Sequence, residues 1–167
     1  MPIIYSDLIW RLVKRQMLSM RTSIADQATH FEVFTDGSLK AGKGSWAFVI
    51  LKNGKLFHES SGRAKKTTSN RMEFQSAIEA LRLLPQGSEV TLFSDSRVLI
   101  DTVTLWMQDW QSNGWVKRNR IPIPSVDQIK ILYQLDKSHR ISWRWVRAHS
   151  GNIHNDRADQ LCLLART

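Results

Sequence analysis

The chain has 167 residues, 42% of them hydrophobic, and a formal net charge of +9 at pH 7. This length favours one domain with a buried core, and the excess of positive charge indicates an anionic partner. No apolar run approaches the roughly 20 residues of a membrane-spanning helix, which excludes a segment of that kind. The single cysteine, Cys162, excludes an internal disulfide. It lies on an apolar helical stripe, so we expect a buried structural thiol in a cytoplasmic protein.

Residues 1–29 differ from the rest of the chain. Apolar residues at positions 8, 9, 12, 13 and 17 have helical spacing, and Ser6 or Asp7 is suited to cap that helix. Basic residues interrupt the stretch, so it is no secretory signal. A basic amphipathic helix suits an organelle-targeting peptide, a nucleic-acid-binding arm or a packed helix. Asp7 and Asp26 count against targeting, and we expect a loosely attached extension before a domain at residues 30–167.

Residues 30–167 show alternating strand and helix patterns. Asn53-Gly54 between two apolar runs is a strong hairpin signal, Pro85 ends the first helical pattern, and Ser125 is suited to cap a later helix. A meander followed by alternating helices and strands predicts an α/β fold, with a mixed five-stranded sheet flanked by helices on both faces. The predicted strands are 31–36, 44–51, 55–62, 89–94 and 141–146, and the helices are 71–84, 125–135, 155–165 and one from residue 96 past Val103.

Four acidic residues and one histidine occupy positions where functional groups gather in such a sheet. Asp36 and Asp95 end predicted strands, whereas Glu73 and Asp159 flank the apolar faces of predicted helices. His149 lies in a predicted loop. Taken singly, each acid is more often a helix cap or a solvated charge. Carboxylates about 5 Å apart repel by roughly 3 kcal/mol at an effective dielectric of about 20, so a divalent cation such as Mg²⁺ or Mn²⁺ is the expected remedy.

The neighbours of these residues form motifs in one order along the chain. The motifs are Thr35-Asp36-Gly37-Ser38, Asn70-Arg71-Met72-Glu73, Ser94-Asp95-Ser96, Trp143-Arg144-Trp145-Val146-Arg147-Ala148-His149-Ser150-Gly151 and Asn155-Asp156-Arg157-Ala158-Asp159. From about Phe31 to Leu164, the chain resembles ribonuclease H of type 1. The resemblance implies the ribonuclease H fold. It also implies an endonuclease that hydrolyses the RNA strand of RNA–DNA hybrids with two Mg²⁺ ions, leaving 5′-phosphate and 3′-hydroxyl ends.

The resemblance also implies roles for the five residues. Asp36, Glu73, Asp95 and Asp159 resemble the metal-binding carboxylates, and His149 resembles a histidine that assists proton movement and product release. Two metals about 4 Å apart activate a water and stabilise the leaving 3′-oxygen, so no covalent nucleophile is needed. Asp36, on the central strand, is the expected bridge between the metals. We expect Mn²⁺ to substitute for Mg²⁺.

Contacts to the substrate follow from the same resemblance. Residues 68–70 match the segment of the family that contacts the minor groove of the hybrid and a DNA phosphate. Asn and Ser side chains read 2′-hydroxyls, which distinguish RNA from DNA. Asn70 has an alternative role as the cap of the helix that carries Glu73. The residues expected to contact the hybrid in this part of the chain are Gly37, Ser38, Thr68, Ser69, Asn70 and Arg97.

Residues 106–124 resemble the basic protrusion of the family, which is called the handle. Its cations are expected to bind the DNA backbone, and an aromatic ring to pack on a sugar. Trp106 and Trp110 lie four residues apart, so we expect them to pack the handle against the domain. Binding is expected instead from Trp115, Lys117, Arg118 and Arg120.

Two features depart from the family pattern. The loop after Ser38 is shorter than usual and lacks an asparagine, and Ser69 stands where asparagine is usual; both bear on substrate selectivity. Three other functions were weighed: a junction resolvase or transposase core, a catalytically silent hybrid-binding module and a proofreading-type exonuclease. The handle argues against a resolvase or transposase core, and the complete set of carboxylates argues against a silent binding module. The spacing of the acids argues against an exonuclease. We expect a monomer with no membrane partner and no obligate protein partner.

Overall fold

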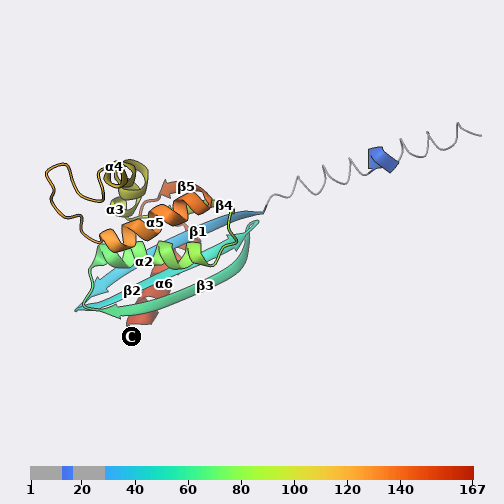
Figure 1. The fold of residues 1–167 in the computed structure, drawn as a ribbon. Helices are drawn as coiled ribbons and strands as arrows, with labels where there is room; N and C mark the ends of the chain where they lie inside the picture. The colour runs from blue at the N-terminus through green and yellow to red at the C-terminus, as the bar shows by residue number, and fades with distance from the viewer. Residues whose placement is uncertain (1–12, 17–28) are drawn as a thin grey trace, which may run out of the picture.

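A single mixed sheet organises the molecule. The structure, a computed structural model, describes residues 13–16 and 29–167. Five strands pair in the order β3-β2-β1-β4-β5 (Figure 1). β1 pairs antiparallel with β2 and parallel with β4, so it is the central strand. The strands are β1 (His30–Lys40), β2 (Lys43–Lys52), β3 (Lys55–Lys65), β4 (Glu89–Ser94) and β5 (Arg140–Trp145).

Helices cover both faces of the sheet. Figure 1 shows α2 and α5 on the near face and α6 on the far face. The helices that follow the first three strands are α2 (Ser69–Arg82), α3 (Arg97–Asp101), the π-helical turn η1 (Thr102–Trp106), α4 (Met107–Ser112), α5 (Val126–Ser138) and α6 (Ile153–Arg166). Within the described residues, no helix has the length and apolarity that a membrane span requires. The predicted α/β fold, with its flanked five-stranded sheet, is confirmed.

β1 supplies side chains to two cores because alternate residues of a strand point to opposite faces. Phe31 and Val33 join the larger core, with residues of α2, α3 and α5. Phe34 packs on the other side with Ala158 of α6. The hairpin between β2 and β3 turns at Asn53 and Gly54, which both have positive φ as a tight hairpin requires. This confirms the predicted turn.

The helical segment after β4 contains a π-turn. α3, η1 and α4 follow one another without a break, and the Met107 N–H donates to the carbonyl of Thr102, five residues earlier. The extra residue shifts the helical phase between α3 and α4. The sequence predicted a helix here, but a pattern of apolar spacing does not show where a π-turn lies.

One predicted helix cap stands at its expected position without a side-chain hydrogen bond, and the alternative role of Asn70 as a cap was wrong. Thr68, not Asn70, caps α2, since its side chain accepts a hydrogen bond from the Arg71 N–H, and Asn70 lies inside the helix. Ser125 stands at the N-cap position of α5 but has a left-handed φ of 58° and makes no side-chain cap hydrogen bond. Residues 13–16 are helical, whereas the rest of the predicted N-terminal helix lies outside the described residues. The domain boundary at residue 29 therefore stays a prediction.

Gly37 allows α2 to lie directly against the central strand. A Cβ on Gly37 would collide with the backbone of Met72 and Glu73. Because backbone cannot yield as a flexible side chain can, only glycine fits at this crossing. The close approach brings Glu73 of α2 beside Asp36, the residue before Gly37.

We expect Gly37→Ala to destabilise the protein by about 3 kcal/mol or more, since overpacking against rigid backbone is costly. Gly62→Ala is the matched comparison, because its Cβ would meet the ring of Trp46, a side chain that can move. We expect that variant to lose a smaller amount, about 1–2 kcal/mol. Urea unfolding of both variants measures the difference, and equal losses would contradict the proposed role of the crossing.

Candidate active site

Asp36 and Asp95 lie side by side at the centre of the sheet. β1 and β4 are parallel and pair in the register Thr35 to Ser94, so the next residues on the two strands are Asp36 and Asp95. Asp36 is buried, with only 7% of its surface exposed, and Asp95 is half-buried. Register thus brings together two acids that are far apart in the sequence.

Glu73 completes a group of three carboxyl groups. It projects from α2 and is 8% exposed. Asp36, Glu73 and Asp95 each offer an oxygen, and these oxygens all lie within 4.8 Å of one another. The predicted convergence of these three acids is therefore present in the structure.

The electrostatics of the group favour protonation or a bound cation. Burial raises the pKa of Asp36 to about 6. A hydrogen bond from Cys162 partly opposes this rise, and the charges of Asp95 and Asp159 add to it. Burial and the two neighbouring aspartates also raise the pKa of Glu73 well above its usual value. The pKa of Asp95 is raised as well, chiefly by burial. A divalent cation would offset the same desolvation and repulsion.

The unpartnered oxygens of the group fit a metal. Oδ2 of Asp36 and Oε2 of Glu73 are buried and have no hydrogen-bond partner among the residues that the structure describes. Buried polar atoms are nearly always paired, and a carboxylate oxygen can only accept when ionised. Hard oxygen donors converging in this way suit Mg²⁺ or Mn²⁺.

Asp159 and His149 lie near the three carboxyl groups but outside the group itself. Asp159 is half-buried on α6, and its charge raises the pKa of both Asp36 and Asp95. His149 is exposed in the loop between β5 and α6, and its charge lowers the pKa of Asp95. His149 has a positive φ of 50°, and Gly151 follows at 85°. All five predicted residues thus come from separate elements to one end of the sheet.

Two residues that support Asp95 were missed in the sequence. Asn155 is buried on α6, and its side chain lies close enough to Asp95 to lower the pKa of that carboxyl group. It precedes Asp159 by four residues, so the helical spacing was an available signal. Trp145 donates its Nε1–H to the Asp95 carbonyl at 3.0 Å, and the guanidinium of Arg97 lies 3.8 Å from the centre of its ring. Arg97, predicted to contact substrate, therefore stacks on Trp145 beside the site.

The buried thiol of Cys162 lies directly behind Asp36. Its Sγ–H donates to the Asp36 carbonyl at 3.3 Å. Burial, together with the charge of Asp36, holds the pKa of the thiol well above its ordinary value. The expected structural role of Cys162 agrees with this contact, because an unionised, buried thiol is unreactive.

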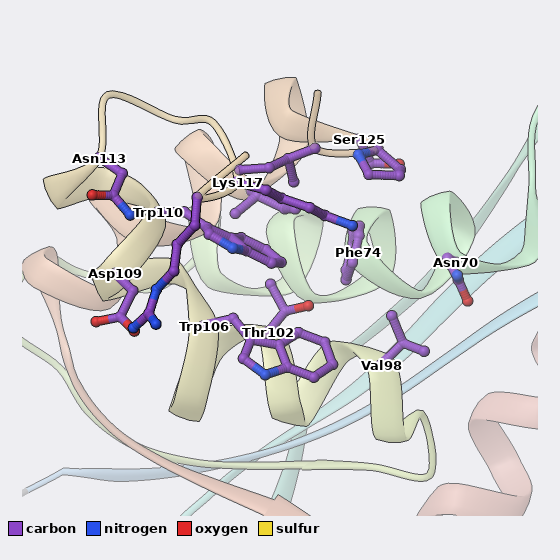
Figure 2. Close-up of a pocket in the computed structure, with 14 residues that line it drawn as sticks. Asn70, Phe74, Val98, Thr102, Trp106, Asp109, Trp110, Asn113, Lys117 and Ser125 are labelled. Carbon is purple, nitrogen blue, oxygen red and sulfur yellow. The ribbon is translucent and has the colours of Figure 1, made fainter. Parts of the chain in front are cut away.

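A cavity of about 550 Å³ separates the handle from α2 and α5. Trp106 and Trp110 form one wall with Thr102, and Lys117 reaches across from the handle (Figure 2). Trp106 is 40% exposed, and its ring centre lies 5.8 Å from that of Trp110. Asn70 stands at the edge of the cavity. The cavity combines aromatic faces with cations, as surfaces that bind nucleic-acid backbones do.

The structure places the tryptophans of the handle in different surroundings, and the binding role expected of Trp115 stays a prediction. Trp115 packs edge-on against Tyr133, with ring centres 5.5 Å apart, and joins the rim of the main core. It does not line the cavity, whereas Trp106 and Trp110 do, and Trp110 also packs against the main core as expected. Lys117 and Arg118 line the cavity as well, but Arg120 lies outside it in an exposed turn.

The remaining residues predicted to contact the substrate either contact other parts of the protein or are exposed to solvent. Gly37 packs against α2, and Ser38 accepts a hydrogen bond from Arg166. Thr68 caps α2, as described above, and Ser69 is exposed in its first turn. Exposure at the start of α2 leaves Ser69 and Asn70 accessible to a ligand near the carboxyl groups.

Comparison with known proteins decides the family. The model of the RNase H family matches residues 28–166. A ribonuclease H of Hahella chejuensis is 43% identical over 135 residues, covering 80% of this chain and 90% of that protein. One of Erythrobacter litoralis is 40% identical over 132 residues, covering 78% and 91%. The chain belongs to the ribonuclease H family.

The fold of this ribonuclease H agrees with that assignment. The crystal structure of LC9-RNase H1, a type 1 RNase H, superposes with a TM-score of 0.74 and 28% identity, covering 83% of this chain and 72% of that chain. The resemblance to type 1 ribonuclease H is thus confirmed, and the protein is a nuclease of the hydrolase class. Its family cleaves the RNA strand of RNA–DNA hybrids.

We expect Trp145→Phe to lower turnover about tenfold in this ribonuclease H, because the ring stays but the hydrogen bond that positions Asp95 is lost. Trp143→Phe is the matched control on the same strand, since it removes the Nε1–H bond to Asp136 at 2.8 Å, which supports no carboxyl group of the site. Each variant should lose about 1 kcal/mol of stability. A comparable fall in turnover for both would show that the Asp95 contact has no special role.

We expect Asp36→Asn to be more stable than the wild type at pH 7 in EDTA, by on the order of 2–3 kcal/mol. The folded pKa of Asp36, about 6, lies above the ordinary value of 3.8, so the folded state binds the proton more tightly. Ionisation therefore removes stability as pH rises from about 4 to 6. Melting temperatures across this range should diverge with rising pH. Asp101→Asn in α3, outside the site, is the control, and parallel curves would contradict the raised pKa.

Proposed function

We propose that this ribonuclease H hydrolyses the RNA strand of a hybrid by a two-metal-ion mechanism, with Mg²⁺ as the physiological ion, and leaves 5′-phosphate and 3′-hydroxyl ends. The observation that carries the proposal is the group formed by Asp36, Glu73 and Asp95, with two buried oxygens that have no partner. Such a group is costly unless cations complete it. Bound at these oxygens, the ions would supply Lewis acidity and a nucleophilic water.

Each carboxylate has a distinct task in this proposal. Asp36, on the central strand, would hold both ions. Glu73 and Asp95 would supply further ligands, and Asp159, half-buried on α6, would contribute from the opposite face of the sheet. Because all four side chains come from packed elements, they hold the reacting groups in place without rearrangement.

His149 serves proton transfer in the same proposal. It is exposed in the loop before α6 and close enough to Asp95 for its charge to affect the pKa of that carboxyl group. An imidazole can carry a proton and donate it through a ring nitrogen, so His149 is suited to protonate the leaving 3′-oxygen. Its position in a loop, beside Gly151, lets it approach and leave the product.

The substrate would lie across the site toward the handle. The RNA strand passes the carboxyl groups, and Ser69 and Asn70 at the start of α2 meet the minor groove, where 2′-hydroxyls are available. The DNA strand follows the cavity beside Trp106 and Trp110, with Lys117 and Arg118 at its phosphates. Solved relatives include LC11-RNase H1 in complex with an RNA/DNA hybrid, which shares the fold at a TM-score of 0.59 and 20% identity.

One chain supplies every group in this proposal. The carboxylates, His149 and the cavity belong to a single protomer, which supports action as a monomer without an obligate protein partner. The single buried Cys162 suits the reducing cytoplasm that the sequence predicts.

A cleavage assay on a hybrid, beside duplex DNA and duplex RNA, tests the function. We expect cleavage of the RNA strand of the hybrid alone, only with Mg²⁺ or Mn²⁺, and none in excess EDTA. Asp36→Asn should lower the rate by several orders of magnitude while hybrid binding is largely retained, since affinity comes mainly from phosphate and hydroxyl contacts. End-labelled products should carry 5′-phosphates. Turnover within about tenfold of wild type for Asp36→Asn would refute its bridging role.

A further inference from the structure

A second cavity, lined by cations, lies on the α6 side of the sheet. It has a volume of about 470 Å³, and its lining contains no carboxylate. Lys43 opens β2, Arg63 and Lys65 close β3, and Arg166 ends α6; Gly44 and Ala64 complete the lining. Figure 1 shows the C-terminus beside these ends of β2 and β3. We call this the α6-side cavity.

Strand pairing explains why three of the cations share one face. Lys43 pairs with Lys65, and Ser45 pairs with Arg63 two residues farther along. Residues two apart on a strand point to the same face, so Lys65 and Arg63 both point to the side that α6 covers. None of Lys43, Arg63 and Lys65 forms a salt bridge within the described residues. Their positive charges are therefore available to an anion.

Arg166 connects the α6-side cavity to the active site. It is half-buried and donates a hydrogen bond to the Ser38 hydroxyl, two residues beyond Asp36. Its charge also lowers the pKa of Asp36, which shows that the two groups are close. A nucleic-acid strand whose phosphodiester lies at the carboxyl groups would therefore meet this cavity as it continues along β1.

We propose that the α6-side cavity binds a backbone phosphate of the RNA strand, beyond the bond that is cut. The inference rests on the proposed function, because the strand at the carboxyl groups is the RNA strand. The handle cavity lies on the other face of the sheet, with α2 and α5, and serves the DNA strand. The two cavities would then hold the two strands of one hybrid from opposite faces.

The chemistry of the lining favours a phosphodiester over other anions. Four cations around one cavity repel each other, and a multiply contacted phosphate offsets that repulsion by releasing condensed counterions. Arginine forms paired hydrogen bonds to phosphate oxygens, and the lysines act as point charges. The lining lacks the large apolar side chains that anchor an acidic peptide.

The test compares two triple variants of the full-length chain. Lys43→Gln, Arg63→Gln and Lys65→Gln together remove three of the four cations that line the α6-side cavity and leave Arg166 in place. Lys52→Gln, Lys55→Gln and Arg140→Gln form the matched control, since they remove three exposed cations at the opposite end of the sheet. All six residues are exposed, so both proteins should fold, and Arg63→Gln alone provides a milder variant.

Affinity for a fluorescein-labelled hybrid is measured in EDTA over a range of salt concentrations. We expect the cavity variant to lower the log–log salt slope by roughly 0.7–0.9, since the cavity holds one phosphate and each phosphate contact contributes about that much. The control variant should keep the wild-type slope. With Mg²⁺, the cavity variant should raise KM and leave kcat unchanged. Equal slopes for the two triple variants would overturn the proposal while the cleavage reaction stands.

Neutral methylphosphonates identify the strand. Hybrids are prepared with a single methylphosphonate at each position of the RNA strand in turn. A methylphosphonate beyond the cut bond should lower the affinity of the wild type for the hybrid and leave the affinity of the cavity variant unchanged. If only DNA-strand methylphosphonates show this pattern, the assignment to the RNA strand is wrong. If neither strand does, the cavity binds another anion, such as an acidic peptide, and the proposal falls. Because binding is measured without cleavage, a failure of the two-metal mechanism leaves these outcomes readable.

Discussion

Repulsion among largely buried carboxyl groups is the constraint on which the rest of this structure depends. Asp36, Glu73 and Asp95 have oxygens within 4.8 Å of one another, in a place where water is largely excluded. Low local dielectric strengthens that repulsion and makes each unpaired oxygen costly. Secondary structure must therefore oppose it. Parallel pairing holds β1 and β4 together, and α2 packs directly on β1 at Gly37, which has no side chain.

Supporting contacts reach the carboxyl groups from both faces of the sheet. On the α6 side, Cys162 donates to the Asp36 carbonyl, and the side chain of Asn155 lies beside Asp95 and lowers its pKa. Beyond the end of β4, Trp145 holds the Asp95 carbonyl while Arg97 covers its ring. These contacts position the acids but leave Oδ2 of Asp36 and Oε2 of Glu73 without a hydrogen-bond partner among the described residues. A site that is rigid in its frame and incomplete in its ligands is suited to take up cations without rearranging.

The sequence predicted the acids better than it predicted their surroundings. Asp36 and Asp95 were found because each ends an apolar run, a local pattern that survives without knowledge of the fold. Trp106 and Trp110 were expected to pack and were not predicted to line a cavity, because the phase of their helix depends on a π-turn that apolar spacing does not reveal. Asn70 was weighed as a cap although Thr68, two residues earlier, closes the turn. The cations of the α6-side cavity are distant in sequence and meet only through strand register.

The π-turn in η1 has a consequence for how this helix can change over evolution. A regular α-helix turns about 100° per residue, and a π-turn accommodates one residue more than its flanking helices need. Deleting one residue between Thr102 and Trp106 would restore regular winding and rotate α4 by about that angle relative to α3. Trp110 would then swing away from the cavity while the core residue Leu99 stayed in place. Relatives with a gap at this point should therefore have a differently lined cavity on an unchanged sheet.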